Sequence, residues 1–189
     1  MSTARAKTDA SSDRPPVTVS TSHAPTAASA GPNALAWLWL SAVVIVLDQA
    51  SKLYFLSILE YGGPTIPVID GFWEWQLAKN HGAAFSFLAG ASGWQRWFFS
   101  ALAIGISGLL VHWLRKLPRA HWREALPFAL IIGGALGNLI DRVRFGYVVD
   151  FVHWYWREHS WPVFNLADSA IVAGAVLLVV ATFFPGGRR

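Results

Sequence analysis

The chain has 189 residues, of which 54% are hydrophobic and 14% are charged. This balance is more apolar than that of an ordinary soluble domain, and the apolar residues cluster in long runs, so the composition indicates an integral membrane protein. The absence of cysteine excludes disulfides, thiolate nucleophiles and cysteine-bound metals. The formal charge of +4 does not indicate nucleic-acid binding, because the basic residues lie beside hydrophobic runs rather than along a basic stripe.

Residues 1–33 are rich in Ala, Ser, Thr and Pro and contain no aromatic residue. Such a segment cannot bury enough apolar surface to fold, so we expect a disordered cytoplasmic tail. The composition disfavours a secretory signal, because the small-residue string AASA at 27–30 precedes the first apolar run, whereas a cleavage site should follow it.

Four apolar runs approach the roughly 20 residues needed to cross a bilayer. They cover residues 35–56, 97–114, 125–140 and 163–184. We therefore predict a four-helix membrane domain at 34–185 and a short cytoplasmic end at 186–189. Basic residues in the tail, in the loop between the second and third runs and at the end favour cytoplasmic positions for all three. The protein is then a multi-pass membrane protein with both termini cytoplasmic.

The connection between the first two runs contains a hairpin signal. Residues 65–69 and 72–78 flank Asp70-Gly71, a dipeptide that favours a tight turn, and Trp73, Trp75 and Leu77 would share one face. We interpret it as a small amphipathic hairpin lying on the membrane, in preference to a platform that contacts a substrate. The predicted fold is all-α, with a small extracytoplasmic β element between helices 1 and 2.

Polar residues inside the runs are the informative ones, because charges in a membrane are costly and often functional. Asp48 and Lys52 lie four residues apart on one helix face and can neutralise each other, so a structural ion pair and a direct catalytic role both remain open. The string GGALGNLIDR at 133–142 combines the glycines Gly133 and Gly137, which permit close helix packing, with Asn138 and Arg142 on one face. We expect Asn138 and Arg142 to orient other groups, and Asp141 to be a solvated or salt-bridged edge residue.

Two aspartates flank the aromatic segment before the last run. Asp168 lies at the mouth of that run, and Asp150 lies at the other end of the segment, so both carboxylates can meet at one membrane face. Two such carboxylates can share a proton and activate a water molecule without any cofactor. Asp48, Lys52 and Asn138 are expected at the same outer depth, which favours a functional site over scattered structural residues.

Three other features of the sequence suggest rival hypotheses. The string GISG at 105–108 is similar to a rhomboid serine motif, but no histidine follows within a later span, so small-residue helix packing is the better explanation. His153 and His159 lie in the aromatic segment without a zinc motif, and we expect interface residues. A small transporter or non-enzymatic bundle would use Asp48, Asp150 and Asp168 as a proton or cation path, although no inverted repeat is visible.

Five strings in order resemble the successive sequence blocks of lipoprotein signal peptidases, also called signal peptidase II. They are LDQASK (47–52), NHGAAFS (80–86), GGALGNLIDR (133–142), GYVVDF (146–151) and WPVFNLADS (161–169). The resemblance implies an intramembrane aspartic endopeptidase that removes the signal peptide of a prolipoprotein by cutting before a diacylglyceryl-modified cysteine. Its implied partners are lipid-modified prolipoproteins and membrane lipids, with no nucleic acid, cofactor or metal, and we expect a monomer with its site near the outer face.

The same resemblance implies roles for particular residues. Asp150 and Asp168 would form the catalytic pair. The positions that would hold this pair or the substrate are Asp48, Lys52, Asn80, Gly82, Asn138, Arg142 and Asn165. The long N-terminal tail departs from the family pattern, and the resemblance implies nothing about its role.

Overall fold

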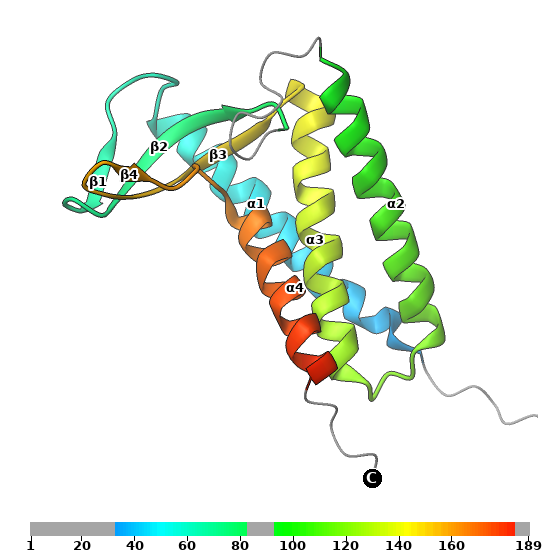
Figure 1. Cartoon of the computed structure of the whole chain (residues 1–189). Helices are drawn as coiled ribbons and strands as arrows, with labels where there is room; N and C mark the ends of the chain where they lie inside the picture. The colour runs from blue at the N-terminus through cyan, green and yellow to red at the C-terminus, as the bar shows by residue number, and fades with distance from the viewer. Residues whose placement is uncertain (1–32, 83–92, 184–189) are drawn as a thin grey trace, which may run out of the picture. The chain divides into compact units, whose positions relative to one another are not determined.

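Four long helices make up most of the computed structural model, which describes residues 33–82 and 93–183 (Figure 1). A short 3-10 helix, η1 (Ala34–Trp37), leads into α1 (Leu38–Ile58), and the other three are α2 (Trp94–Lys116), α3 (Trp122–Phe145) and α4 (Leu166–Phe183). Each of these four, with η1 added to α1, is long and apolar enough to cross a membrane. The chain is a multi-pass membrane protein, as predicted. Apart from Asn33, the predicted tail lies outside the described residues, as does the C-terminal end.

The helix bounds differ from the predicted runs for physical reasons. α3 continues to Phe145, past the predicted end at 140. The apolar run stops at the charged residues Asp141 and Arg142, whereas the helix continues through them. α4 begins only at Leu166, because Phe164 forms an isolated bridge with Val152 and so extends the chain before the helix. The apolar pattern therefore ends α3 too early and begins α4 too early.

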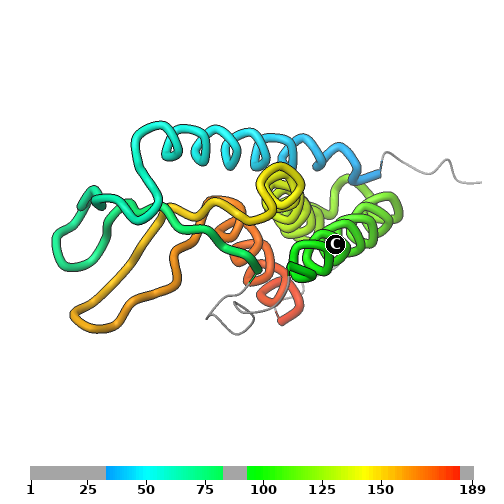
Figure 2. The backbone as a smooth tube through the Cα atoms, turned by 90° about the horizontal axis from the view of Figure 1, so that it is seen from above, coloured from blue at the N-terminus to red at the C-terminus, as the bar shows by residue number. Residues whose placement is uncertain are grey.

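α3 is the central helix and packs against α1, α2 and α4 (Figure 2). Glycines make these contacts close. A Cβ atom added at Gly133 would lie 2.7 Å from Cβ of Val44 on α1, and one added at Gly137 would lie 2.7 Å from Oδ2 of Asp48. The predicted packing role of Gly133 and Gly137 is confirmed, and the proximity brings the polar face of α3 against Asp48.

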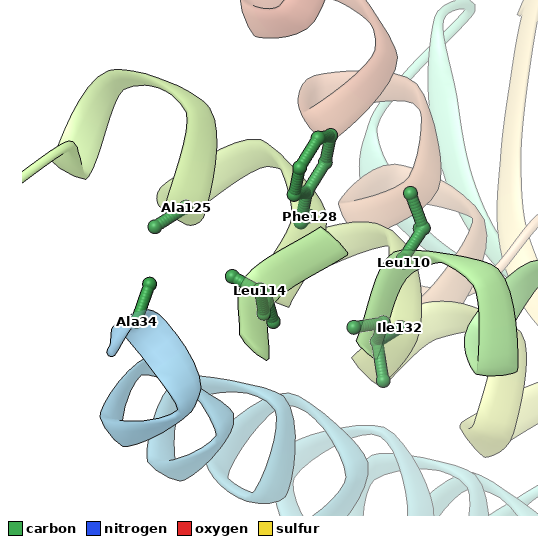
Figure 3. Packing of buried hydrophobic residues seen from close by; sticks show 6 residues of the cluster. All are labelled: Ala34, Leu110, Leu114, Ala125, Phe128 and Ile132. Carbon is green, nitrogen blue, oxygen red and sulfur yellow. The ribbon is translucent and has the colours of Figure 1, made fainter. Parts of the chain in front are cut away.

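One apolar cluster closes the helices at the end where α2 and α3 are joined (Figure 3). It consists of Ala34 from η1, Leu110 and Leu114 from α2, and Ala125, Phe128 and Ile132 from α3. The backbone N–H of Ala34 also donates to the carbonyl of Leu117, at 2.8 Å. This hydrogen bond and the apolar cluster thus hold the start of the first span against the end of the second.

A four-stranded antiparallel sheet projects sideways from the opposite end of the helices, in the order β1-β2-β3-β4 (Figure 1). Its strands are β1 (Ile66–Ile69), β2 (Trp73–Asn80), β3 (Val148–Trp156) and β4 (His159–Ser160). The predicted hairpin is confirmed, with Gly71 at φ +77° in the turn. The sheet also contains β3 and β4 from between α3 and α4, which the sequence did not reveal because the first four residues of β3 are all buried and do not alternate.

A second apolar cluster joins this sheet to the end of α1. The ring of Phe55 stacks on Phe151 of β3 at 4.3 Å between centroids and contacts Trp75 of β2 at 4.6 Å. Leu77 is buried in the same cluster, and Trp73 contacts the ring of Trp75, so the three hairpin residues predicted to share a face do so. This packing fixes the beginning of β3, which carries Asp150, beside α1.

Candidate active site

Asp150 and Asp168 reach the site from different kinds of structure. Asp150 lies in the buried half of β3, between Val149 and Phe151, and is itself buried. Asp168 lies in the first turn of α4 and is only partly buried. Asn165, which immediately precedes α4, lies between them and is fully buried. The fold therefore brings Asp150 on strand β3 close to Asp168 at the start of helix α4.

Asn165 makes hydrogen bonds to both aspartates. Its side-chain amide donates to Oδ1 of Asp150 at 2.6 Å, and its backbone N–H donates to Oδ2 of Asp168 at 3.3 Å. Its side-chain oxygen in turn accepts the backbone N–H of Asp168 at 2.8 Å, an N-terminal cap on α4. One residue thus fixes the start of the helix and the relation of the two carboxyl groups.

Asn138 of α3 connects this pair to a buried cation. Its amide donates to Oδ1 of Asp168 at 2.7 Å. Its oxygen accepts from the ammonium of Lys52 at 3.0 Å and from the amide of Asn165 at 3.1 Å. The side-chain amide is therefore oriented by donors on one side and a carboxylate on the other, and it holds Asp168 in place.

Lys52 lies between two carboxylates. Its ammonium is 2.8 Å from Oδ2 of Asp48 on its own helix and 2.9 Å from Oδ2 of Asp141 on α3. The predicted Asp48–Lys52 pair is confirmed as an ion pair, and both residues are almost completely buried, with 0% and 2% of their side chains exposed. Two acidic partners and Asn138 supply the three acceptors that an ammonium group requires.

The two acidic partners of Lys52 also hold backbone near the aspartate pair. Oδ1 of Asp48 accepts the backbone N–H of Ala167 at 3.0 Å, and Oδ2 of Asp141 accepts that of Val149 at 3.0 Å. Ala167 precedes Asp168 and Val149 precedes Asp150. The ion-pair network therefore holds the backbone immediately before each aspartate.

The remaining predicted residues lie around the same place. Asn80, at the end of β2, makes a side-chain hydrogen bond to Asp150, and its Oδ1 accepts the backbone N–H of Gly82 at 2.9 Å. Gly82 has φ +119°, and a Cβ atom there would lie 2.6 Å from the ring of Phe99. Arg142 interacts electrostatically with both aspartates, and its guanidinium lies over Phe99, 5.3 Å from the ring centroid. All nine predicted site residues are thus brought together.

The surroundings of Asp150 favour the protonated carboxyl group. Burial, and next the negative charge of Asp168, raise its pKa from 3.8 to about 8, although hydrogen bonds from Asn80 and Asn165 and the charge of Lys52 oppose the change. Because two close carboxylates resist simultaneous ionisation, the pair holds a proton at neutral pH. One group can then accept a proton while the other donates one.

A family model described as signal peptidase (SPase) II matches residues 40–184 of the chain. The chain belongs to the signal peptidase II family. It is 60% identical over 157 residues to a lipoprotein signal peptidase of Xanthomonas campestris, covering 83% of this chain and 93% of that one. It is 59% identical over 153 residues to that of Xylella fastidiosa, covering 81% and 91% respectively.

Solved structures agree with this family assignment. A bacterial membrane enzyme solved by the in meso method at 2.3 Å superposes with a TM-score of 0.70 at 30% identity, covering 82% of this chain and 92% of that one. A second, at 1.9 Å, gives 0.67 at 31% identity, with 78% and 92% covered. Membership of the signal peptidase II family makes the chain a peptidase.

Sequence reasoning missed one member of the polar cluster and misplaced another. The salt bridge that was one alternative for Asp141 is present, but the residue is buried rather than at an edge, with only 1% of its side chain exposed. The missed member is Gln49, whose amide donates to Oδ1 of Asp141 at 2.9 Å and to Oδ2 of Asp48 at 3.2 Å. The spacing could have indicated the position of Asp141, because it lies three residues after Asn138 and therefore on the same face of α3, the face that meets Lys52.

The serine motif at 105–108 is only partly explained by helix packing. Ser107 is buried, and its hydroxyl makes no hydrogen bond within the described residues, so no base activates it. Gly105 and Gly108, however, have no described atom beyond their own stretch of helix within 4 Å of where a Cβ would lie, so the expectation that they pack helices is wrong. Both glycines are exposed, and they lie two residues before and one residue after the buried Ser107.

Proposed function

We propose that the chain is an aspartic endopeptidase that removes signal peptides from prolipoproteins, cutting before a diacylglyceryl-modified cysteine, with Asp150 and Asp168 as the catalytic pair. The observation that carries the proposal is a set of hydrogen bonds to these carboxyl groups. Asn165 and Asn80 bond to Asp150, and Asn138 bonds to Asp168. The relatives named as lipoprotein signal peptidases support the substrate class.

The mechanism divides acid and base roles between the two carboxyl groups. The ionised group takes a proton from a water molecule, whose oxygen attacks the carbonyl carbon of the scissile peptide bond. The protonated group donates to the carbonyl oxygen, giving a neutral tetrahedral intermediate. The C–N bond then breaks as the newly protonated carboxyl group donates its proton to the amine nitrogen, while the other carboxylate takes a proton from a hydroxyl group of the intermediate. The pair thereby returns to its singly protonated state. No added metal or cofactor is required.

Supporting residues keep the pair in position through this cycle. Asn138 and Asn165 donate hydrogen bonds to the carboxyl oxygens of Asp168 and Asp150, respectively. Asp48 and Asp141, which both pair with Lys52, accept the backbone N–H groups of Ala167 and Val149. Arg142 is the cation near both aspartates that is not buried in the ion-pair network, and we assign it to contact the substrate or its developing charge.

The site's place in the fold suits a lipid-modified substrate. The aspartates lie where α4 begins and where the sheet meets the helices, so acyl chains can remain beside the spans while the peptide bond reaches water. By the positive-inside rule this end faces outward and both termini are cytoplasmic, in the cell inner membrane. We expect the protein to act as a monomer without nucleic acid.

The test uses the purified full chain in detergent with two forms of one precursor. One carries a diacylglyceryl group on its cysteine, and the other has an unmodified cysteine. We expect release of the signal peptide from the lipidated form alone, with the cut before the cysteine located by mass spectrometry. Failure to cleave either precursor would overturn the proposal, and equal cleavage of both would overturn its lipid specificity.

The alternative of a transporter is separated by the same measurement. Detergent solution has no membrane gradient, so a proton or cation path through Asp48, Asp150 and Asp168 would give no product there. Cleavage that disappears in Asp150→Asn and Asp168→Asn excludes this alternative as the main function.

A further inference from the structure

A row of four polar side chains crosses the sheet outside the aspartate site. Thr65, just before β1, donates its hydroxyl to Oε2 of Glu74 on β2 at 2.7 Å. Oε1 of Glu74 lies 2.9 Å from Nδ1 of His153 on β3, and Nε2 of His153 lies 2.6 Å from Oγ of Ser160 on β4. The register explains the row, because Glu74 and His153 are cross-strand partners and Ser160 lies opposite Tyr155.

The chemistry of each group fixes the direction of these hydrogen bonds. Burial opposes ionisation of Glu74, but hydrogen bonds from His153 and Thr65 outweigh it and lower the pKa of the carboxyl group, so Glu74 is ionised near neutral pH. An ionised carboxylate only accepts, so Nδ1 of His153 donates to it. In the neutral ring Nε2 then accepts, and the hydroxyl of Ser160 donates to it.

This order of groups is that of a nucleophile, its base and the group that orients the base. The alternative acceptor for the Ser160 hydroxyl, the carbonyl of Trp161, is 3.5 Å away, far longer than the 2.6 Å to His153. Ser160 is exposed, whereas Glu74 and His153 are largely shielded, with 17% and 14% of their side chains exposed. The hydroxyl is thus accessible while the groups behind it are held in place.

We propose that Ser160 is a second, activated nucleophile of this protein, with His153 as its base and Glu74 as a positioning residue, and that it accepts acyl groups from carboxylic esters. Nothing in the aspartate site requires these three residues. The proposal therefore stands or falls independently of the proposed peptidase function.

The neighbouring surface favours esters that carry an apolar chain. Trp156 and Trp161, on either side of the β3–β4 turn, are 61% and 59% exposed, and Trp154 is 43% exposed. Tryptophan side chains are suited to a membrane–water interface, which is where lipid esters present their carbonyl groups. An acyl chain lying on these rings would bring its ester within reach of Ser160.

The reaction is balanced by water alone. Oγ of Ser160 forms a bond to the acyl carbon while Nε2 of His153 takes the hydroxyl proton, and the ester C–O bond breaks as the proton passes to the leaving alkoxide. Water then attacks the acyl-serine in the same way, which releases the carboxylic acid and restores the hydroxyl group. No oxidant, reductant or metal takes part.

The test is covalent labelling of the full chain in detergent with diisopropyl fluorophosphate, with the modified serine located by mass spectrometry. Ser57 provides the matched control, since it is an exposed serine whose hydroxyl donates at 2.6 Å to the carbonyl of Tyr54 and not to a histidine. We expect Ser160 to be labelled at least about 100-fold faster than Ser57, the range that a general base supplies. Equal rates at the two serines would overturn the proposal.

Three variants assign the roles. Ser160→Ala should lose the label and the hydrolysis of p-nitrophenyl butyrate, while cleavage of a lipidated precursor stays at the parental rate. His153→Asn should slow labelling of Ser160 to about the rate at Ser57. Unchanged labelling in a folded His153→Asn protein would overturn the role of the base, and if that variant fails to fold, the comparison of Ser160 with Ser57 in the unmodified protein decides.

Glu74 acts through His153, so its test compares labelling with stability and includes a conservative variant. We expect Glu74→Gln to slow labelling of Ser160 while the labelling rate of Ser57 and the unfolding temperature stay near the parental values, because the neutral amide orients the His153 ring less firmly. Glu74→Asp, which keeps the carboxylate, should restore part of the labelling rate. Unchanged labelling in Glu74→Gln would show that Glu74 only joins the strands.

Discussion

The side-chain amide of Asn165 donates a 2.6 Å hydrogen bond to a carboxyl oxygen of Asp150, fifteen residues earlier in the chain. The same residue caps α4 and donates its backbone N–H to Asp168. Strand β3 and helix α4 therefore cannot move apart without breaking the contacts of Asn165. The geometry of the aspartate pair depends on a neutral amide, which does not compete for the proton that the pair holds.

Replacing either aspartate by asparagine should abolish cleavage without unfolding the protein. Asparagine keeps the size of the side chain and loses its proton chemistry, and general acid–base catalysis is worth about 10²–10⁴-fold in rate. We expect Asp150→Asn and Asp168→Asn each to lose at least that much, measured as cleavage of a lipidated precursor per folded molecule. Substantial turnover by either purified variant would remove the catalytic assignment.

Activity and stability should both depend on the proton held at Asp150. Its pKa is raised from 3.8 to about 8, so the folded state binds this proton more tightly than the unfolded state does. The stabilisation is complete below about pH 4, decreases as the pH rises, and is lost above about pH 8. The cleavage rate should also decline as the pH rises through about 8, because the pair then loses its proton-donating carboxyl group.

Thermal unfolding in detergent between pH 4 and 9 measures the stability effect. Asp150→Asn cannot ionise, so its unfolding temperature should vary less with pH over this range than that of the parent protein. The parallel measurement is the pH profile of kcat/KM for the parent, which reports the pair as a whole. Identical pH dependence of unfolding in the parent and in Asp150→Asn would contradict the raised pKa.

The charges around Lys52 predict an ordered series of stabilities. Lys52→Met leaves Asp48 and Asp141 buried without their cation, and an unpaired buried charge commonly costs about 3–5 kcal/mol. The double variant Asp48→Asn with Lys52→Met should recover only part of this loss, because Asp141 still lacks its partner. Adding Asp141→Asn removes the last unpaired charge and should recover more.

The measurement for this series is thermal unfolding, with the cleavage rate of each variant recorded alongside. If the triple variant is stable yet slow, the network acts by positioning Ala167 and Val149 beside the aspartates. A Lys52→Met protein as stable as the parent would contradict the supporting role of the ion pairs.

Replacement by alanine should reduce stability and activity at one helix glycine, Gly137, and not at another, Gly108. In Gly137→Ala the new Cβ would lie 2.7 Å from Oδ2 of Asp48, so the helices must shift and the contact of Asp48 with Lys52 is disturbed. Gly108→Ala meets nothing within 4 Å and improves helix propensity, by about 1 kcal/mol at most. We expect Gly137→Ala to lower the unfolding temperature and the cleavage rate, and Gly108→Ala to lower neither.

Inhibitor classes provide a separate check on the mechanism. Chelators, thiol-alkylating agents and serine-directed fluorophosphonates should leave peptide cleavage intact, because the proposed chemistry uses two carboxyl groups and water. A fluorophosphonate can modify Ser160 under these conditions without affecting cleavage. Activity that is lost with a chelator and restored by zinc would instead indicate a metallopeptidase.

The helices and the aspartates were predictable because each leaves a local signal. Long apolar runs specify spans, and Asp168 is conspicuous at the mouth of one. β3 was missed because it is buried along its first half, so its residues lack the alternation that marks a strand. Gln49 and the salt bridge of Asp141 depend on which faces of α1 and α3 meet, and that is decided by packing at Gly133 and Gly137 rather than by the residues themselves.

The pairing of Lys52 with an acid on its own helix affects how the chain enters the membrane. Asp48 is one turn away on α1, so the two charges can neutralise each other as soon as this helix forms. α3 and α4, which supply Asp141, Asn138 and the N–H of Ala167, are synthesised later. During translation the first span can therefore leave the translocon as a nearly neutral segment. A chain with Asp48→Asn would present a lone ammonium at that step, so its defect should be visible already in the yield of inserted protein.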